Sequence, residues 1–531
     1  MKLLLRLVSI LLVTCGFAQT VRQNETLRGL TSPQTVSDTL PAPKYLQDHV
    51  VDGKLRLSLQ DAIVAMLMNN SNVRIQELNV ESAKYSLLGT HSKFDPLVQA
   101  GFAATRATFT VNPQAQGSLL QSSSLTQIST LDYRQVFETG TIAQIGFNAT
   151  RFWDSSAQTF NPSIASGLTF QLTQPLLRNR WLFANRALLV IARHTLSASR
   201  SSFEGQVNDA ILNVVSQYWE VVRASGNLEV AKKSQDMADA SYKYDKRKLE
   251  LGALPPLDIY QSESQLASRR VQVITSEYQL KQDEDLLRNT LGADGDPFLR
   301  ALDLELTELP ARDEELLNID AATALKEALD GRPELEAQRQ FLASDDTNIR
   351  LADNSLLPDL SLSANYSGNG LAGSPSGGLA ESLNQAFGFG FPTYGFSLNL
   401  NLPIRNRGAQ AELGTALVSR RRDLYTERQL REQVTFQVFN AVHMLEQAKL
   451  SLAASREALD LSKKNLHARQ RKIELGAEDP FFVLQAQTDL AQAESSVVQA
   501  EVAYQLAVAT AQHATGKLLE PYHVQISDLT R

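Results

Sequence analysis

Three segments of the chain alternate apolar and polar residues with a period of two. They are 168–174 (Leu-Thr-Phe-Gln-Leu-Thr-Gln), 360–366 (Leu-Ser-Leu-Ser-Ala-Asn-Tyr) and 396–402 (Phe-Ser-Leu-Asn-Leu-Asn-Leu). Successive side chains of a strand point to opposite faces of its sheet, so the alternation predicts strands with one apolar and one polar face. Within 125–153, the piece Gln144 to Thr150 alternates in the same way. It predicts either an extended loop or an additional hairpin.

Long tracts without proline follow these strands. The tracts 185–251 and 410–475 contain no proline, and in the second Leu445, Leu452, Leu459 and Leu466 recur every seven residues. Such spacing is typical of helices that pack as coiled coils. Each predicted helix ends at a Gly-Ala-x-x-Pro segment and returns, over 256–291 and 480–515. The pattern therefore predicts two long helical hairpins.

Shorter helical patterns precede the strands. One runs over 57–94 with a break near 69–71, and the other runs over 321–353 with a break at Gly331-Arg332-Pro333. The segment 367–391, between two of the predicted strands, is rich in Gly, Ser and Asn, which predicts a long loop.

The order of these features occurs twice. The segment Leu249 to Pro256 (Leu-Glu-Leu-Gly-Ala-Leu-Pro-Pro) recurs 224 residues later as Ile473 to Pro480 (Ile-Glu-Leu-Gly-Ala-Glu-Asp-Pro), and Gly292 then falls on Gly516. The chain is therefore interpreted as a duplicated unit. The predicted division is a polar segment 19–54, a first repeat 55–292 with strands at about 98–175 and a hairpin 185–291, a linker 293–318, a second repeat 319–516 with strands at about 359–402 and a hairpin 410–515, and a tail 517–531.

The first 18 residues have the pattern of a secretory signal peptide. A basic start with Lys2 and Arg6 precedes a short apolar stretch, and small residues precede Gln19. The single cysteine, Cys15, leaves an alternative in which cleavage yields a lipidated Cys15. Elsewhere no segment approaches the ~18 consecutive apolar residues of a membrane helix. If the protein lies in a membrane, it must therefore do so as a β-barrel.

The combination of two-faced strands with long helices favours a membrane channel. In a transmembrane barrel the apolar face meets lipid and the polar face lines water. Two strand pairs give four strands per chain, too few to close a water-filled barrel, so several chains are needed. Three would supply twelve strands. The net charge of −7 disfavours a nucleic-acid partner.

At 55–516 the sequence resembles the TolC family of outer-membrane efflux proteins. The resemblance rests on the duplication, on the strand ending Leu172 to Arg178 (Leu-Thr-Gln-Pro-Leu-Leu-Arg) and on the hairpin tips 252–261 and 476–485. It implies a fold that is mainly α with transmembrane β, in which a homotrimer forms an outer-membrane β-barrel continued by a periplasmic α-barrel. It also implies two partners, a periplasmic adaptor protein and an inner-membrane pump.

The resemblance also points to residues of the periplasmic entrance. Phe482 and Gln485 stand where the family has a ring of acidic residues, so that ring is absent here. Asp258 matches a family carboxylate that helps to hold the closed state, but Ile473 and Glu478 stand in place of its usual partners.

Other groups at the tips have two interpretations each. Glu478 and Asp479 could make the entrance prefer cations, or they could simply cap the helix that begins near Pro480. A ring of Phe482 could form a hydrophobic constriction. Gly252 and Gly476 are expected to end their helices in the left-handed conformation, and their position at the tips also makes them candidate adaptor contacts.

Enzymatic motifs are weak. Gly368 to Gly373 fits the Gly-x-Gly-x-x-Gly pattern but opens no predicted helix, and the seven histidines have no metal-like spacing. The sequence thus predicts no catalytic, cofactor or metal site. It predicts a passive channel protomer for efflux or type I secretion, with a periplasmic coiled-coil adaptor or scaffold as the alternative.

Overall fold

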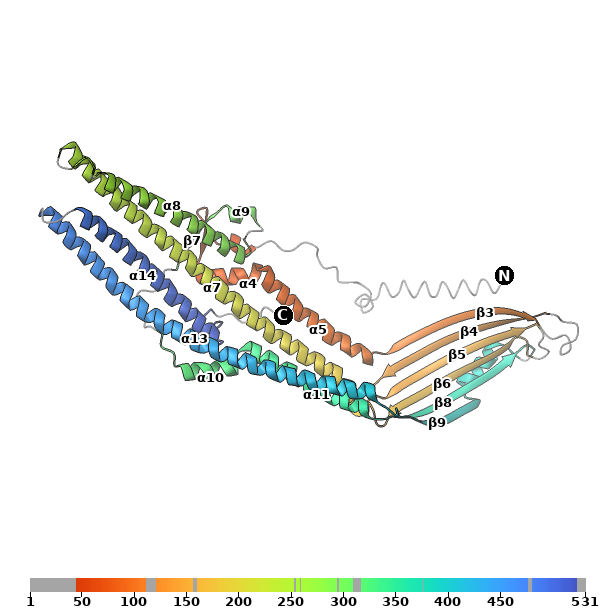
Figure 1. Cartoon of the computed structure of the whole chain (residues 1–531). Coiled ribbons are helices and arrows are strands. Elements are labelled where there is room, and N and C mark those ends of the chain that lie inside the picture. Colours follow the sequence, from red (N-terminus) through yellow and green to blue (C-terminus); the bar gives the residue numbers. More distant parts are fainter. Residues whose placement is uncertain are drawn as a thin grey trace.

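The computed structural model describes residues 44–110, 121–155, 160–252, 255–257, 259–293, 296–308, 317–375, 377–475 and 480–522. A curved sheet forms one end of the elongated molecule and long helices form the rest (Figure 1).

The sheet has six antiparallel strands in the order β3-β4-β5-β6-β8-β9. Four come from the first repeat: β3 (Leu97–Thr110), β4 (Gln121–Val136), β5 (Ile142–Asp154) and β6 (Ser163–Pro175). Two come from the second: β8 (Asp359–Gly373) and β9 (Phe391–Asn401). The count of four strands per chain was too low. Of the two alternatives for the alternating piece at 144–150 the additional hairpin is present, because the piece belongs to β5, which pairs with β4.

The register gives the sheet two chemically distinct faces. Phe170 of β6 lies opposite Tyr366 of β8, and Leu362 of β8 lies opposite Leu398 of β9. On the other side Gln171 lies opposite Asn365. We call these the apolar face and the polar face. The predicted alternation is thus present in three dimensions, and large side chains of the apolar face are exposed in the single chain.

The predicted loop at 367–391 was also wrong. Strand β8 continues to Gly373, and the helix α12 (Leu379–Phe387) follows it. The Gly-x-Gly-x-x-Gly pattern therefore lies within a strand. Its glycines have a packing role, because a Cβ atom at Gly370 would come within 1.9 Å of the carbonyl oxygen of Ser382, in α12.

The two long hairpins extend away from the sheet. Helix α7 (Trp181–Glu250) pairs with α8 (Ile259–Thr290), and α13 (Arg407–Glu474) pairs with α14 (Pro480–Ala514). At 1.5 Å per residue, a helix of 70 residues spans ~105 Å. The long proline-free tracts therefore fold as continuous helices, as the sequence predicts.

Shorter helices complete a layer four helices wide. In the first repeat these are α4 (Leu59–Asn69), α5 (Ser71–His91) and the short 3-10 helix η1 (Ser92–Phe94), and in the second α10 (Ala321–Gly331) and α11 (Pro333–Leu356). Helices α5 and α8 contact α7, whereas α11 and α14 each contact both α7 and α13. The order across the layer is therefore α5/α8, α7, α11/α14, α13 (Figure 1).

A small sheet crosses the middle of the helical layer. Strand β2 (Lys54–Leu57) pairs with β1 (Val50–Val51) and, in parallel, with β7 (Asp303–Leu306). The short helices α3 (Lys44–Gln47) and α9 (Pro297–Arg300) flank it. The helical pattern predicted from residue 57 therefore begins two residues late, because Leu57 ends a strand and Ser58 caps α4.

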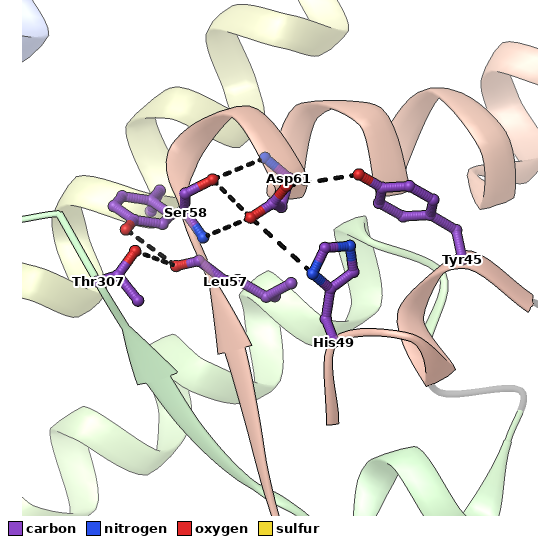
Figure 2. A network of polar contacts seen from close by, with 7 residues as sticks. Tyr45, His49, Leu57, Ser58, Asp61 and Thr307 are labelled. Atoms are coloured by element: carbon purple, nitrogen blue, oxygen red, sulfur yellow. Dashed lines mark hydrogen bonds and ion pairs between the residues drawn. The ribbon is translucent and has the colours of Figure 1, made fainter. Parts of the chain in front are cut away.

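Polar contacts fasten this small sheet to α4 and α7 (Figure 2). The backbone oxygen of Leu57 accepts hydrogen bonds from the hydroxyl groups of Tyr218, at 3.2 Å, and Thr307, at 3.4 Å. Burial alone would raise the pKa of Asp61, but hydrogen bonds from Ser58 and Tyr45 and the nearby His49 bring it below its usual value. Segments about 250 residues apart are thereby held together.

Two carboxyl groups meet where α11 packs on α13. Asp345 is buried close to Asp423, and the carboxylate of Asp423 pairs with the guanidinium of Arg422 at 3.0 Å. Burial, followed by the charge of Asp423, raises the pKa of Asp345 to about 6. In the unfolded chain the same group titrates near its ordinary value of 3.8. Between about pH 4 and pH 6, the carboxyl group of Asp345 therefore keeps its proton in the folded state and has lost it in the unfolded state.

We expect stability to fall as the pH rises from about 4 to about 6 and then to level off. Asp345→Asn should remove this dependence and raise the free energy of unfolding at pH 8 by on the order of 1 kcal/mol. Urea unfolding at several pH values measures it. Asp353→Asn, which removes an exposed carboxylate from the same helix, is the control. An unchanged pH profile in Asp345→Asn would show that Asp345 is not responsible.

Candidate functional site

The tips of the two hairpins lie at the same end of the molecule, farthest from the six-stranded sheet (Figure 1). Gly252 follows α7 with a φ of 70°, the left-handed conformation expected from the sequence, and its amide donates to the oxygen of Leu249 at 3.0 Å. Nothing lies within 4 Å of where its Cβ would be. Glycine is required here by backbone conformation and not by close packing.

Several predicted entrance residues lie outside the described residues. These are Asp258, Gly476, Glu478 and Asp479. Their roles stay predictions.

The other two predicted entrance residues lie on the first turns of α14. The ring of Phe482 is 44% exposed, contacts the ring of Phe481 edge-on and lies under the guanidinium of Arg469, 5.2 Å from its centroid. Because Arg469 belongs to α13, this cation–π contact holds the two helices of the hairpin together near its tip. The amide of Gln485 donates to Asp489 at 2.9 Å.

Polar contacts connect the first hairpin to the second near the tips. The hydroxyl oxygen of Thr488, on α14, accepts from Arg269 at 2.6 Å and from Gln265 at 3.2 Å, both on α8. We call this the Thr488 contact. Farther from the tips, Ser495 of α14 donates to Asn227 of α7 at 2.9 Å. In both contacts the acceptor is an uncharged side-chain oxygen.

A cavity of about 470 Å³ lies between the hairpins beside this contact. It is lined by Tyr244 and Asp245 of α7 and by Ile473 and Gln487 of the second hairpin, among others. Ile473 thus packs between the hairpins. Burial raises the pKa of Asp245, partly offset by a hydrogen bond with Ser262 and by the charge of Lys248.

Two features are absent from the described residues. Their helices include none that combines the length and apolar character needed to cross a membrane. Within the same residues, no three His, Cys, Asp or Glu side chains gather as metal ligands.

Residues 138–293 and 324–517, about two thirds of the chain, match the family model described as outer membrane efflux protein. The chain belongs to the outer membrane efflux protein family. Membership confirms the TolC resemblance and places the protein in the outer membrane, with its helices extending into the periplasm. The alternative of a periplasmic adaptor or scaffold does not fit this family.

Relatives of this outer membrane efflux protein are distant in sequence. The probable efflux pump outer membrane protein TtgC and the antibiotic efflux pump outer membrane protein ArpC, both from Pseudomonas putida, are each 22% identical over 338 residues. These alignments cover 63% of this chain and 66% of each relative, just under two thirds of their length.

Solved structures share the fold more completely. The structure of CusC, which is described as forming a transmembrane channel, has a TM-score of 0.64 at 16% identity. The match covers 91% of this chain and 96% of the CusC chain. The CmeC outer membrane channel of Campylobacter jejuni has a TM-score of 0.63 at 16% identity, with 94% of both chains covered. At this identity the likeness establishes the arrangement of helices and strands.

Proposed function

We propose that three copies of the chain assemble into a passive export channel that crosses the outer membrane and extends through the periplasm. A periplasmic adaptor would dock at its hairpin tips, and an inner-membrane pump would supply the energy. The observation that carries the proposal is that the sheet and the helical layer each end on both sides in elements without a neighbouring strand or helix, while the sheet has one apolar and one polar face.

The six-stranded sheet ends in unpaired strands on both sides. Within the described residues β3 and β9 are its outer strands, and every residue of both is exposed. Unpaired backbone groups in a lipid environment are costly, so each edge needs a partner strand. Pairing β9 of one copy with β3 of the next would satisfy both edges. Three sheets of six strands would close with eighteen strands, replacing the twelve expected from the sequence.

The helical layer is open in the same way. Helix α13, at one side, buries Val434, Val438 and Leu445 against its neighbours. A second apolar stripe lies on the opposite side of α13 and is exposed in the single chain: Val418, Tyr425, Phe436, Leu450 and Leu461. Helices with two apolar sides have neighbours on both.

The other side of the layer shows the complementary feature. Helix α5 exposes Ile75, Leu78, Tyr85 and Leu88, and α8 exposes Val271, Ile274 and Tyr278, all large apolar side chains. We infer that the α13 stripe of one copy packs against α5 and α8 of the next copy. The ring closes through the sheet and the helices together.

The polar face would line the lumen of the barrel part. A hollow of about 410 Å³ on the sheet is lined mainly by residues of this face, including Gln99, Thr130, Asp132, Gln144 and Gln171. These side chains hydrogen-bond water and offer no arrangement of reactive groups. They suit passive conduction.

The hairpin tips carry exposed leucines that suit contact with a partner protein. Leu251 and Leu257 at the first tip are 77% and 78% exposed, and Leu475 at the second is 72% exposed. Leu251 and Leu475 occupy equivalent places in the two repeats, beside Gly252 and Gly476. A ring of such tips would present apolar side chains at regular intervals to an adaptor.

The assembly is tested with the mature protein extracted from outer membranes. Extraction should require detergent, native mass spectrometry should give the mass of three copies, and planar bilayers should show discrete conductance steps. A protein that is soluble and monomeric without detergent would rule out the channel.

Replacing Thr488 by valine is expected to favour the open entrance. Valine has nearly the shape of threonine but accepts no hydrogen bond, so the links to Gln265 and Arg269 are lost. Their loss costs about 1–3 kcal/mol in the closed arrangement of each copy. Single-channel recordings should show a higher mean conductance. Thr510→Val is the matched control, since both hydroxyls donate to a carbonyl of their own helix but only Thr488 reaches the other hairpin. Equal conductance in both variants would exclude the Thr488 contact as a latch.

Replacing Glu478 by glutamine together with Asp479 by asparagine is expected to lower cation selectivity. Three copies would lose six negative charges at the mouth, and their summed field attracts cations. Reversal potentials under a salt gradient measure this. Glu457→Gln, ~25 Å from the end of α13, is the control. Unchanged selectivity would leave the two residues with the capping role alone.

A further inference from the structure

Helix α12 lies on the apolar face of the six-stranded sheet, where Figure 1 shows it as a short blue-green helix behind the strands. A Cβ at Gly368 would approach the oxygen of Ala386 to 2.2 Å, and Ser166 of β6 contacts Ser382 with 2.7 Å between their hydroxyl oxygens. Gly368 and Ser166 both belong to the apolar face. The glycines of β8 therefore admit the helix directly onto the strands.

Helix α12 has one side buried against the sheet and an apolar side that is largely exposed. Ser382 and Ala386 are fully buried against the sheet. Leu379, Leu383 and Phe387 recur every four residues and form a stripe beside this contact, with Leu379 and Phe387 more than half exposed. We call these three residues the α12 stripe. It leaves large apolar surface on a face that already exposes apolar side chains.

The stripe extends the apolar surface of β8 outward. Along β8 the apolar face offers Leu360, Leu362, Ala364 and Tyr366, but continues as Gly368, Gly370 and Ala372. Six residues of strand span ~20 Å, or ~15 Å along the membrane normal at the usual tilt. The apolar band of such barrels is ~25 Å tall. The helix supplies the side chains that the glycines lack.

The stripe lies over the chain's own strands and away from the open edge. The ring of Phe387 stacks on Phe147 of β5 at 5.6 Å, and Phe389 contacts Phe170 of β6 and Tyr366 of β8. On the other side of the helix, Gln385 accepts from the amide of Leu371. A neighbouring copy paired with β9 would therefore meet the polar side of α12. Lipid, and not a second copy, would cover the stripe.

Two arginines lie on the apolar face near its outer end. Arg151 of β5 is opposite Ile164 and Gln127, and Arg106 of β3 is opposite Leu125, so all share this face. Arg151 donates to the neutral Gln127 at 2.8 Å. No carboxylate among the described residues lies within 4.0 Å of either guanidinium. By register Arg151 lies level with Ala372 near the outer end of β8, and Arg106 lies two residues farther out.

We propose that the outer end of the apolar face binds an anionic membrane lipid, whose phosphate contacts Arg106 and Arg151 and whose acyl chains lie along the α12 stripe. Guanidinium groups bind phosphate oxygens with paired hydrogen bonds. Arginines at the outer end of the apolar face and an exposed apolar stripe on the same face would suit the two ends of one lipid. This inference rests on the proposed function, because it requires the apolar face to meet the membrane.

Native mass spectrometry of the detergent-solubilised full chain tests the proposal. Dioleoyl phosphatidylglycerol should remain bound in several-fold excess over dioleoyl phosphatidylethanolamine, which has the same chains but no net charge. The double variant Arg106→Gln with Arg151→Gln should lose this preference. Leu379→Ser with Leu383→Ser should lower the binding of phosphatidylglycerol several-fold. Arg134→Gln, which removes a charge from the polar face of the same sheet, should keep wild-type binding.

Each outcome separates the two proposals. A trimer that binds both lipids equally, or that loses as much lipid in Arg134→Gln as in the double arginine variant, overturns the lipid site and leaves the channel intact. Displacement of phosphatidylglycerol by millimolar inorganic phosphate would also overturn it, since the acyl chains would then contribute nothing. A monomeric mass without detergent overturns the channel and the lipid site together.

Discussion

Replacing Gly140 by valine is expected to prevent accumulation of folded protein in the outer membrane. Gly140 is in the turn between β4 and β5 with a φ of 84°, a conformation that costs ~1–2 kcal/mol for a residue with a Cβ. That Cβ would also lie 2.7 Å from the backbone oxygen of Asn179 and 2.6 Å from the amide nitrogen of Asn185. Backbone cannot yield as a flexible side chain can, so the clash separates the turn from the start of α7.

Gly53→Val provides a matched control for this prediction. Gly53 also has a positive φ, 77°, but nothing lies within 4 Å of its Cβ position. It therefore carries the conformational cost without the clash. Membrane fractions and urea midpoints should show a mild loss for Gly53→Val and a severe loss for Gly140→Val. Similar behaviour of the two variants would mean that the sheet and α7 are not joined rigidly at this turn.

Replacing Phe436 by glutamate is expected to abolish trimers while leaving the single chain folded. Phe436 is 71% exposed in one copy, in the middle of the second apolar stripe of α13. If that stripe packs against α5 and α8 of the next copy, the variant buries an unpaired carboxylate at each of three seams. Each such burial costs several kcal/mol. Native mass spectrometry should detect monomers whose circular dichroism is that of the wild type.

Gln433→Glu adds the same charge to an exposed position of α13 outside the stripe. It should form trimers normally. Trimers of Phe436→Glu at wild-type abundance would show that the α13 stripe faces water or lipid, and the proposed closure through the helices would have to be abandoned.

The helical part of the fold could be predicted because its signals are local. Proline-free tracts, leucines seven residues apart and the glycine at each hairpin turn are direct consequences of helix geometry. The duplicated segment around Gly252 and Gly476 aligned the two hairpins. Even the breaks in the short helices were correct, since Asn70 caps α5 and Arg332 precedes the proline that begins α11.

The strands were harder to count because some gain their stability only from their neighbours. In β4 the apolar face includes Gln127 and Ser129 between Leu125 and Leu131, so the alternation is weak. In β8 the glycines at 368 and 370 suggested a loop, since glycine weakens an isolated strand. These positions need glycine because helix α12 packs directly on them. The sequence near the glycines gives no sign of this tertiary contact.

The contacts near the entrance were equally hidden. Thr488 and Arg269 are 219 residues apart, and neither forms part of a motif. The family resemblance pointed to positions that are acidic or aromatic in the family. Of the corresponding residues here, Phe482 and Gln485 are among those that the structure describes. An uncharged hydroxyl that joins two hairpins has no sequence signal, and only the side-chain hydrogen bonds from α8 to α14 show it.

The additional hairpin of β4 and β5 has an electrical consequence. Barrel diameter grows roughly in proportion to the number of strands, so a wall of eighteen strands would be about half again as wide as one of twelve. The helical layer gains no corresponding helix. Successive segments of a pore act as resistors in series, and the narrowest one sets the total. If the hairpin tips form the narrowest segment, as the family resemblance implies, ion flow is governed almost wholly there, and changes to the polar face of the sheet would alter it little.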